Sequence, residues 1–334
     1  MTDPAFHADE VIAQTRAGVL LQRSGIRDFM PEQHRSFFAT LPYLLAATSD
    51  AAGWPLAALL EGDPGFVTSP EPATLRIAAL PGASDPAAGM IRITGEVGLL
   101  GIDFATRRRN RANGIVSSVD ASGFTVAVRQ SFGNCPQYIQ RRTITRAHAS
   151  ASPGREFASL GAEARSLIRR ADTFFVASRS RADIGPGAGA DISHRGGQPG
   201  FVRIESDTLL VPDFRGNRYF NTLGNLLGEP RASLLFLDFD SGDLLQLQGL
   251  AGIDWSASAA ALVPGAERIW RFRVTRGWYR QRAAALRGAL VDYSPVTLRT
   301  GTWSEGPNAE QASQQKLISF GDNPERRLDR NRAR

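Results

Sequence analysis

Short runs of apolar residues alternate with polar residues along most of the chain, and glycine and proline separate the runs. In Phe124–Val128 the apolar residues alternate with Thr125 and Ala127, which is the pattern of a strand with one buried face. The same two-residue period recurs over 245–248 and 271–275. Closely spaced strands favour an antiparallel barrel or sandwich, because a doubly wound sheet would need a helix after each strand. We therefore expect a mainly β (α+β) protein.

The chain also carries three helix signals. Pro31 suits the first turn of a helix, and so does Pro153, where Ser152 can serve as the N-cap. Apolar residues at helical spacing follow over 157–168, and a short helix is expected near Tyr219–Leu227. The expected strands are Leu44–Thr48, Leu56–Leu60, Gly65–Thr68, Thr74–Leu80, Val97–Phe104, Phe124–Val128, Phe174–Ala177, Gly200–Ile204, Thr208–Val211 and Ser233–Asp238.

Three short sequence patterns occur twice with the same 135-residue offset. Two copies are too few for a solenoid, but they fit two similar domains packed against each other in one chain. A chain of 334 residues usually carries about two domains, which agrees. The pairs are P-G-F-V at Pro64 and Pro199, L-L-G-I-D-F at Leu99 with L-L-F-L-D-F at Leu234, and Gly114 with Gly249.

These patterns divide the chain into four parts. We expect an N-terminal arm over 1–27, a first, diverged domain over 28–148, and a second domain over 149–285. A C-terminal extension over 286–334 follows, and its polar end R-R-L-D-R-N-R-A-R predicts a mobile tail.

Composition narrows the possible functions. The net charge is +6 and Lys316 is the only lysine, so the basic residues are almost all arginine, whose planar fork suits phosphate and carboxylate. We expect no nucleic-acid partner, because the run R-R-R-N-R is read as a loop that faces a cleft or a domain interface. The single cysteine, Cys135, excludes an internal disulfide and a cysteine-only metal site. The absence of a signal segment or a long apolar run predicts a cytoplasmic protein with no membrane partner.

Three stretches of the second domain carry the most specific motifs. They are D-I-S-H-R-G-G-Q-P-G-F-V at 191–202, V-P-D-F-R-G-N-R-Y-F-N-T-L-G-N-L at 211–226 and E-P-R-A-S-L-L-F-L-D-F at 229–239. They resemble the central block of the FMN-binding split-barrel family related to pyridoxamine 5′-phosphate oxidase. The first domain resembles a diverged copy, with motifs of that family's flavin-nucleotide-binding branch at 102–114 and 131–141. The resemblance covers residues 28–280 and implies two tandem split barrels.

The resemblance also implies a cofactor and a site. In the family, FMN lies in a cleft where two barrels meet, and basic and polar side chains hold its phosphate. Carried over by position, Arg215, Asn217 and Arg218 would hold the phosphate, with help from Thr222. The strand-entry loop residues Ser193, His194 and Arg195 would lie near the ribityl chain or ring edge, and Gln246 on a later strand could face the flavin. Two guanidinium forks and a turn entering a helix suit a dianionic phosphate on physical grounds as well.

The opposite wall of the cleft would come from the first domain of the same chain or from the other chain of a homodimer. The candidates for this wall are Arg107, Arg108, Arg109, Arg111 and the loop with Asn134 and Gln137. The sequence does not decide between one chain and two.

The expected activity is that of a flavin-dependent oxidoreductase with an unknown substrate. No triad or carboxylate pair is present, and the flavin itself would carry the redox chemistry. Any electron donor, such as NAD(P)H, would be a separate molecule. Three alternatives remain open: a flavin-storage protein, a haem-binding or haem-degrading barrel with His194 or His148 as ligand, and a deazaflavin (F420) reductase. Cys135 and the repeated Asp103 and Asp238 are expected to be structural.

Overall fold

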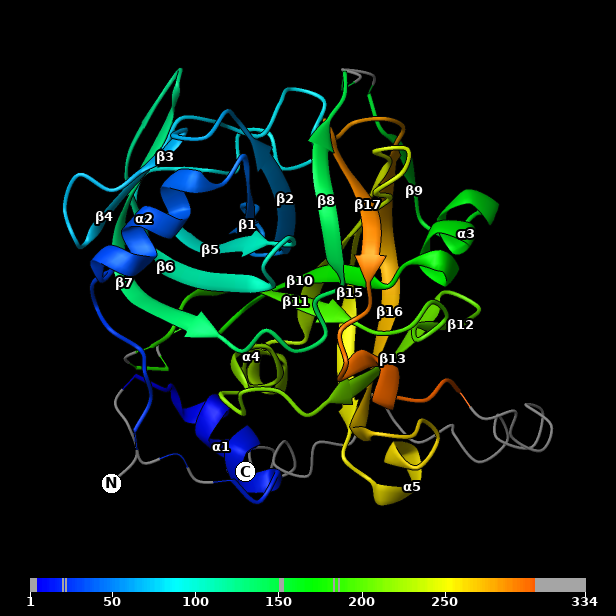
Figure 1. Cartoon of the computed structure of the whole chain (residues 1–334). Coiled ribbons are helices and arrows are strands. Elements are labelled where there is room, and N and C mark those ends of the chain that lie inside the picture. Colours follow the sequence, from blue (N-terminus) through cyan, green and yellow to red (C-terminus); the bar gives the residue numbers. More distant parts are fainter. Residues whose placement is uncertain are drawn as a thin grey trace, which may run out of the picture. The chain divides into compact units, whose positions relative to one another are not determined.

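The computed structural model describes residues 5–19, 21, 23–149, 153–182, 184–185 and 187–303. Ser152 and the predicted tail beyond residue 303 therefore lie outside the described residues. Residues up to Trp303 form one compact unit (Figure 1). Most of its elements are antiparallel strands, with a few short helices. The chain is mainly β, as the sequence predicts.

Seven strands of the first half form one sheet, in the order β2-β1-β5-β6-β7-β4-β3. Helix α2 (Glu32–Thr40) precedes them, with Pro31 at its N-cap as expected. The strands are β1 (Tyr43–Ser49), β2 (Pro55–Glu61), β3 (Val67–Thr68), β4 (Thr74–Ile77), β5 (Glu96–Asp103), β6 (Arg108–Asp120) and β7 (Gly123–Asn134).

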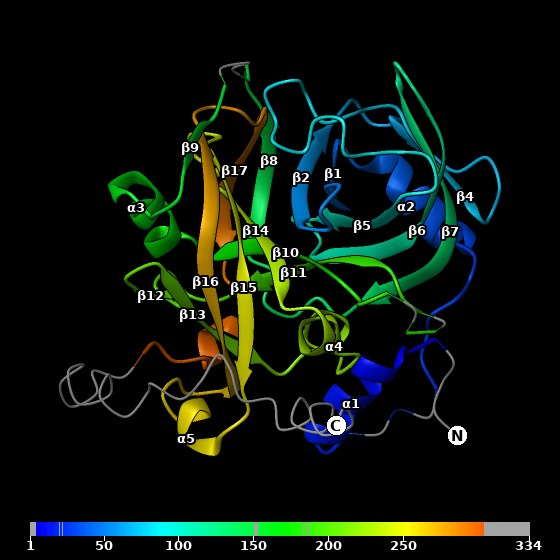
Figure 2. The same ribbon diagram turned by 180° about the vertical axis from the view of Figure 1, so that it is seen from behind.

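The second half repeats this arrangement, in the order β11-β10-β14-β15-β16-β13-β12. Numbered from its own first strand, the second sheet has the same strand order as the first. Figure 2 shows its two long strands, β15 and β16, side by side. The strands are β10 (Thr173–Arg179), β11 (Ala190–Gly196), β12 (Arg203–Glu205), β13 (Thr208–Phe214), β14 (Arg231–Leu237), β15 (Leu244–Asp254) and β16 (Ala266–Arg280). The two sheets are tandem split barrels of one topology.

The repeated glycines mark the same bulge in both sheets. The register between β6 and β7 shifts at Asn113/Gly114, and the register between β15 and β16 shifts at Gln248/Gly249. A Cβ atom on Gly114 would lie 2.1 Å from the carbonyl oxygen of Ala127, and one on Gly249 would lie 2.3 Å from that of Arg273. Only glycine lets the backbones approach this closely.

We expect Gly114→Ala and Gly249→Ala each to lower the free energy of unfolding by about 1–3 kcal/mol, because the added methyl group meets fixed backbone. Gly252→Ala is the matched control, since no atom lies within 4 Å of a Cβ at that position of β15. Its effect should stay within about 0.5 kcal/mol. Urea unfolding measures all three, and equal effects at the three glycines would contradict the bulge argument.

The two sheets share a packed interface with internal symmetry. Edge strand β2 packs across β10, β14 and β15, and its counterpart β11 packs across β1, β5 and β6. Each sheet also has its own apolar core, and a third cluster joins them through residues such as Tyr43, Phe104, Phe175 and Phe239. The halves therefore form a pseudo-dimer within one chain.

Helices and short strands outside the sheets differ in part from expectation. The second predicted helix, α3 (Ala162–Arg170), begins well after Pro153, because residues 155–157 pair with β16 as β9 (Arg155–Phe157). The expected short helix is α4 (Asn221–Gly228), and α5 (Ala257–Ala260) is a single turn. The N-terminal arm contains a helix that the sequence did not predict, α1 (Ala8–Arg16). A ribbon of β8 (Arg141–Arg146) and β17 (Leu286–Asp292) precedes a 3-10 turn at Thr297–Arg299.

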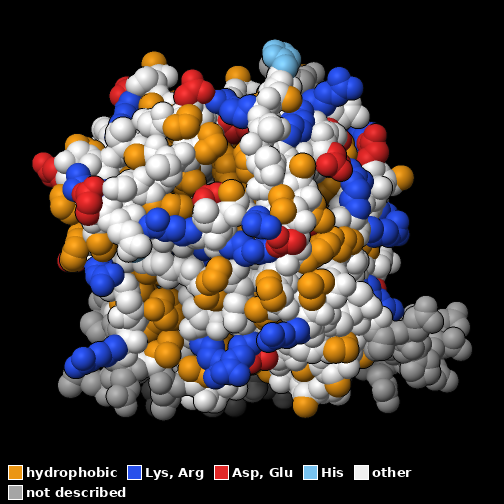
Figure 3. Space-filling model, viewed as in Figure 1, with side chains coloured by type: hydrophobic (Ala, Val, Ile, Leu, Met, Phe, Trp, Pro, Cys, Tyr) orange, Lys and Arg blue, Asp and Glu red, His pale blue; other side chains and the backbone are white. Residues whose placement is uncertain are grey.

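The surface carries many arginines, several of them next to acids. In Figure 3 basic and acidic side chains lie beside each other at several places on the face shown. Asp292, for example, pairs with both Arg107 and Arg141. Within the described part of the chain, no helix is both long enough and apolar enough to cross a membrane.

Candidate ligand-binding site

A cleft opens where the two sheets meet, beside the first turn of α4. Its empty space, including open solvent at the mouth, is about 860 Å³. Both halves of the chain contribute to its wall. Ten of the fourteen residues predicted from the sequence line it: Arg109, Arg111, Asn134, Gln137, Ser193, His194, Arg195, Asn217, Arg218 and Thr222. The other four, Arg107, Arg108, Arg215 and Gln246, do not.

Arg109 and Arg111 reach the cleft from a strand. The sequence reading placed the run R-R-R-N-R on a loop, but β6 begins at Arg108. Because side chains alternate across a strand, residues two apart share a face. Both arginines therefore line the cleft, and Asn113 continues the row towards Asp191.

Arg111 is buried and neutralised within the protein. Its Nη1 donates to the carboxylate of Asp191 and to the side-chain oxygen of Asn221, both at 3.1 Å. Its Nη2 donates to the Ser193 hydroxyl. Asp191 also accepts hydrogen bonds from Asn113 at 2.6 Å and from Asn225 at 3.0 Å. This network fixes the guanidinium at the wall of the cleft.

Arg109 differs because no described acidic side chain pairs with it. Its Nε donates to the carbonyl oxygen of Cys135 at 2.9 Å, and its Nη1 lies 3.2 Å from Nδ1 of His194. Burial is the main cause that lowers the pKa of Arg109, to about 10. The side chain therefore stays cationic at neutral pH, and it brings an uncompensated positive charge to the cleft.

His194 is buried on strand β11 rather than on the predicted strand-entry loop. A guanidinium only donates hydrogen bonds, so Nδ1 of His194 must accept from Arg109 and the ring proton must lie on Nε2. Burial, followed by the charges of Arg109, Arg195 and Arg142, holds the pKa of His194 well below its ordinary value. The imidazole is therefore neutral at neutral pH.

The turn between β13 and α4 forms the other wall. The amide of Asn217 donates to the side-chain oxygen of Asn134 in the first sheet at 3.0 Å, so the two halves meet here. Arg218 adopts a φ of 62° and lies 3.4 Å from Glu267. The Thr222 hydroxyl donates to that of Ser193 at 2.8 Å. Asn221, Thr222 and Leu223, the first residues of α4, also line the cleft, and the first backbone N–H groups of a helix have no partner within it.

Several buried donors of the cleft have no partner among the described residues. Buried polar atoms in native proteins are nearly always hydrogen-bonded, so each exception needs an explanation. A bound anion would supply acceptors for such donors. The unpartnered atoms on cleft-lining residues are Nε of Arg111, Arg195 and Arg218, Nδ2 of Asn134 and Nε2 of His194.

Arg215 does not line the cleft. It is exposed, and only its carbonyl oxygen takes part, as the acceptor of the Tyr138 hydroxyl at 3.1 Å. The positive φ angles of Arg218 and Phe220 turn the chain so that Arg218 lines the cleft instead.

Gln246 lies at the repeat position of Arg111, on the other side of the pseudo-dimer. It is fully buried and donates to the carbonyl oxygen of Ala57 at 2.9 Å and to Asp85 at 3.1 Å. By strand register, Leu56 and Ala58 stand where the cleft has Asp191 and Ser193. These residues pack with a small apolar cluster that includes Ala87, Met90 and Trp278. The position equivalent to the cleft is therefore filled.

Sequence reasoning missed several residues of the cleft. Asp213 pairs with both Arg195 and Arg268, and Glu267 pairs with Arg218. Asp213 belongs to the V-P-D-F motif, directly before the turn between β13 and α4, and this position was a usable signal. Arg268 and Glu267 come from the start of β16, and no local pattern marked them.

Comparisons with known proteins give no match to a protein-family model and none to a curated protein sequence. Solved structures do resemble parts of the chain. HupZ from Group A Streptococcus has 16% sequence identity and a TM-score of 0.30, over 38% of this chain and 98% of that one. A protein from Clostridium acetobutylicum related to general stress protein 26, of the pyridoxinephosphate oxidase family, has 12% identity and a TM-score of 0.26, over 39% and 92%.

A third structure is an FAD-binding protein from Mesorhizobium loti, with 11% identity and a TM-score of 0.26, over 37% of this chain and 96% of that one. Each of the three covers well under half of this chain and nearly all of its own.

Proposed function

We propose that the cleft binds FMN, with the phosphate between Arg109, Asn134 and the turn at Asn217–Arg218. The observation that carries the proposal is the set of unpartnered donors in the cleft beside the uncompensated charge of Arg109. A dianionic phosphate accepts several hydrogen bonds and favours guanidinium partners. The first turn of α4 adds backbone donors of the kind that bind phosphate.

The rest of the wall suits a flat ring that has an apolar edge. Seven apolar or aromatic residues line the cleft, namely Leu100, Tyr138, Phe201, Pro212, Phe214, Phe220 and Leu223. Phe214 also stacks on Tyr138, with ring centroids 5.4 Å apart. Such a mixture of apolar walls and a few convergent polar groups is usual for cofactor sites.

We further propose that the protein is a flavin-dependent oxidoreductase that uses a separate electron donor such as NAD(P)H. When bound, a flavin supplies hydride and electron chemistry that side chains do not. The residues of the cleft then bind and orient it. His194 is neutral at neutral pH, and two arginines hold Asp213, so neither is suited to move protons during turnover. Binding without turnover is the storage alternative.

The geometry of His194 disfavours the haem alternative. A histidine that ligates a metal normally donates its other ring N–H to an acceptor. Here the other nitrogen, Nδ1, faces the guanidinium of Arg109, which is a donor. His148 is exposed and follows β8, away from the residues of the cleft.

Both walls of the cleft come from one chain. The position equivalent to the cleft on the other side of the pseudo-dimer is filled by Trp278 and its neighbours. We therefore expect one FMN per chain, whatever the oligomeric state. A homodimer would then carry two independent clefts.

The test is an absorption spectrum of the purified protein, followed by titration of the apoprotein with FMN. Flavin bands near ~370 and ~450 nm and a stoichiometry of one FMN per chain are expected. A sharp band near ~400 nm would instead indicate haem. Bleaching of bound flavin by NAD(P)H would favour the oxidoreductase over storage. A protein that neither carries nor binds FMN would contradict the proposal.

A further inference from the structure

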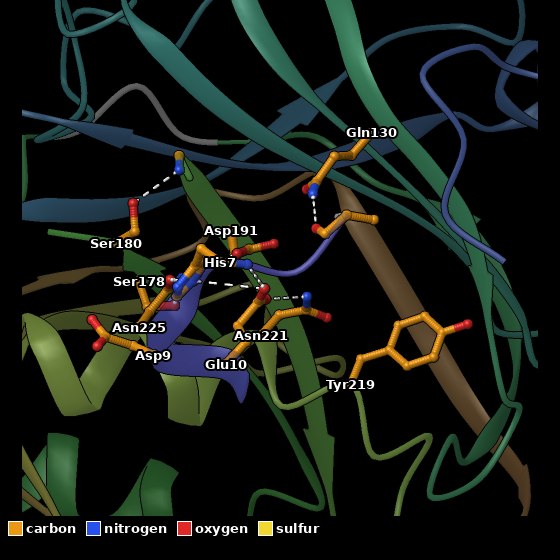
Figure 4. A network of polar contacts seen from close by, with 12 residues as sticks. His7, Asp9, Glu10, Gln130, Ser178, Ser180, Asp191, Tyr219, Asn221 and Asn225 are labelled. Carbon is orange, nitrogen blue, oxygen red and sulfur yellow. Dashed lines mark hydrogen bonds and ion pairs between the residues drawn. The ribbon is translucent and has the colours of Figure 1, made fainter. Parts of the chain in front are cut away.

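The N-terminal arm over residues 5–16 packs against α4 and the turn that precedes it. Figure 4 shows its side chains interleaved with those of α4. His7, Asp9, Glu10 and Gln14 are all at least 96% buried. Burying polar and charged side chains costs free energy unless each finds a partner. Their burial therefore points to a specific docking site.

The arm finds its partners on α4 and on the turn between β13 and α4. Nε2 of His7 lies 2.9 Å from the side-chain oxygen of Asn225. The amide of Gln14 donates to the carbonyl oxygen of Tyr219 at 3.2 Å, and the ring of Phe6 meets the edge of Tyr219. The arm thus holds the segment that forms one wall of the cleft.

Glycines on α4 make this close contact possible. A Cβ atom on Gly224 would lie 2.6 Å from Cα of Glu10, and one on Gly228 would lie 2.0 Å from the carboxylate of Asp9. Asp9 itself pairs with Arg181 at 2.9 Å. The backbones of α1 and α4 can therefore approach each other closely at these glycines.

A chain of hydrogen bonds runs from the arm into the cleft. The amide of Asn221 donates to a carboxyl oxygen of Glu10 at 2.5 Å, and the side-chain oxygen of Asn221 accepts from Arg111 at 3.1 Å. Asn221 and Arg111 both line the cleft. The other Glu10 oxygen accepts from the backbone N–H of His7 at 2.9 Å. Glu10 thus fixes the side chain of Asn221, which contacts the buried guanidinium.

We propose that residues 5–16 form a strap whose docking on α4 and whose release are coupled to occupation of the cleft by a flavin phosphate ligand, through Glu10, Asn221 and Arg111. This inference rests on the proposed function of the cleft.

Docking and ligand binding are coupled because release of the arm would break the contacts that hold the wall of the cleft. Without Glu10, the Asn221 amide loses its acceptor, water reaches Arg111, and the first turn of α4 loses its support. A ligand that binds the docked arrangement better stabilises docking, and docking strengthens binding by the same factor. This reciprocity makes the coupling measurable from both ends.

From the ligand end, the experiment is amide hydrogen exchange on the full chain, with and without saturating FMN. The backbone amides of α1 should exchange about 5- to 150-fold more slowly with FMN bound, which is the usual range of coupling between two sites. From the arm end, Glu10→Ala should weaken FMN binding by a similar factor, mainly through faster dissociation. Ile12→Ala is the matched control, because Ile12 is an exposed residue of the same helix.

The outcomes separate the strap from the cofactor site. If FMN binds the wild-type protein but leaves α1 exchange unchanged, and Glu10→Ala binds FMN normally, the strap is wrong and the FMN site stands. If FMN does not bind the wild-type protein, the proposed function fails, and the strap fails with it. Because the exchange experiment uses the unmodified chain, poor folding of Glu10→Ala would not remove the test.

Discussion

FMN should bind the Arg109→Met variant about 10- to 150-fold more weakly than the wild-type protein. Hydrogen bonds to charged groups contribute about 1.5–3 kcal/mol each, and about 1.4 kcal/mol corresponds to a tenfold change. Arg109 has no described acidic partner, so its removal leaves no buried carboxylate unpaired. The loss should therefore appear in binding rather than in folding. Arg111 differs, because its removal would leave the buried Asp191 carboxylate without its cationic partner.

Arg215→Ala is the matched control for this experiment. Arg215 is an exposed arginine of the same basic region, but it does not line the cleft. Its replacement should change FMN affinity less than threefold, since a distant, screened charge contributes little. Fluorescence titration of FMN measures both variants. If Arg215→Ala weakens FMN binding and Arg109→Met does not, the phosphate does not lie in the cleft, and the proposed site is wrong.

Docking of the arm should weaken by roughly tenfold between pH 6.5 and pH 8. Burial, and next the charge of Asp191, raise the pKa of Glu10 to about 8, while the hydrogen bond from Asn221 and the charge of Arg111 act in the opposite direction. The docked carboxyl is therefore protonated over a pH range in which a released one is ionised. Its contribution is complete below the ordinary pKa of Glu and is lost as the pH rises through 8.

His7 on the same helix limits this trend at lower pH. Burial lowers the pKa of His7, against the raising influence of Asn225, Asp191 and Asp9. Below pH 6.5 a released arm binds a proton at His7 more readily than a docked one, which opposes docking. The loss from His7 then opposes the gain from Glu10, so docking should depend less steeply on pH below 6.5 than above it.

The check is the protection of α1 amides in the protein without ligand, measured from pH 5.5 to 8.5 and corrected for intrinsic exchange rates. Protection should rise as the pH falls from 8 to 6.5 and should change less steeply below pH 6.5. Glu10→Gln should remove the dependence above pH 6.5, because an amide does not titrate there. Protection that increases with pH would overturn the role given to Glu10.

The sequence predicted the sheets best where their strands face an apolar core. Runs such as Leu44–Thr48 and Phe174–Ala177 are buried on both faces and appear as β1 and β10. The 135-residue offset also matched the bulges at Gly114 and Gly249, because a bulge that brings backbones together requires glycine.

The strands that build the cleft were harder to recognise. Strand β11 contains Asp191, Ser193, His194 and Arg195, and β6 begins with arginines. Their polar side chains face the cleft or the other half of the chain rather than an apolar core, so apolar periodicity does not reveal them. Helix α1 was not predicted for a related reason, since its buried face carries the acids Asp9 and Glu10, whose partners Arg181 and Asn221 lie far away in the sequence.

The choice between Arg215 and Arg218 also lay beyond the sequence. Both belong to the same motif, and spacing treats them alike. The left-handed backbone at Arg218 and Phe220 decides which guanidinium lines the cleft. Similarly, the repeat alone did not reveal that Gln246, the counterpart of Arg111, faces a filled interface.

A crystal structure of the full chain with FMN tests the central claim most directly. We predict one FMN per chain in the cleft between the two sheets, with its phosphate within hydrogen-bond distance of Arg109 and Arg218. The position beside Gln246 should hold none. FMN bound wholly within the first sheet, or beside Gln246 and Trp278, would contradict the account.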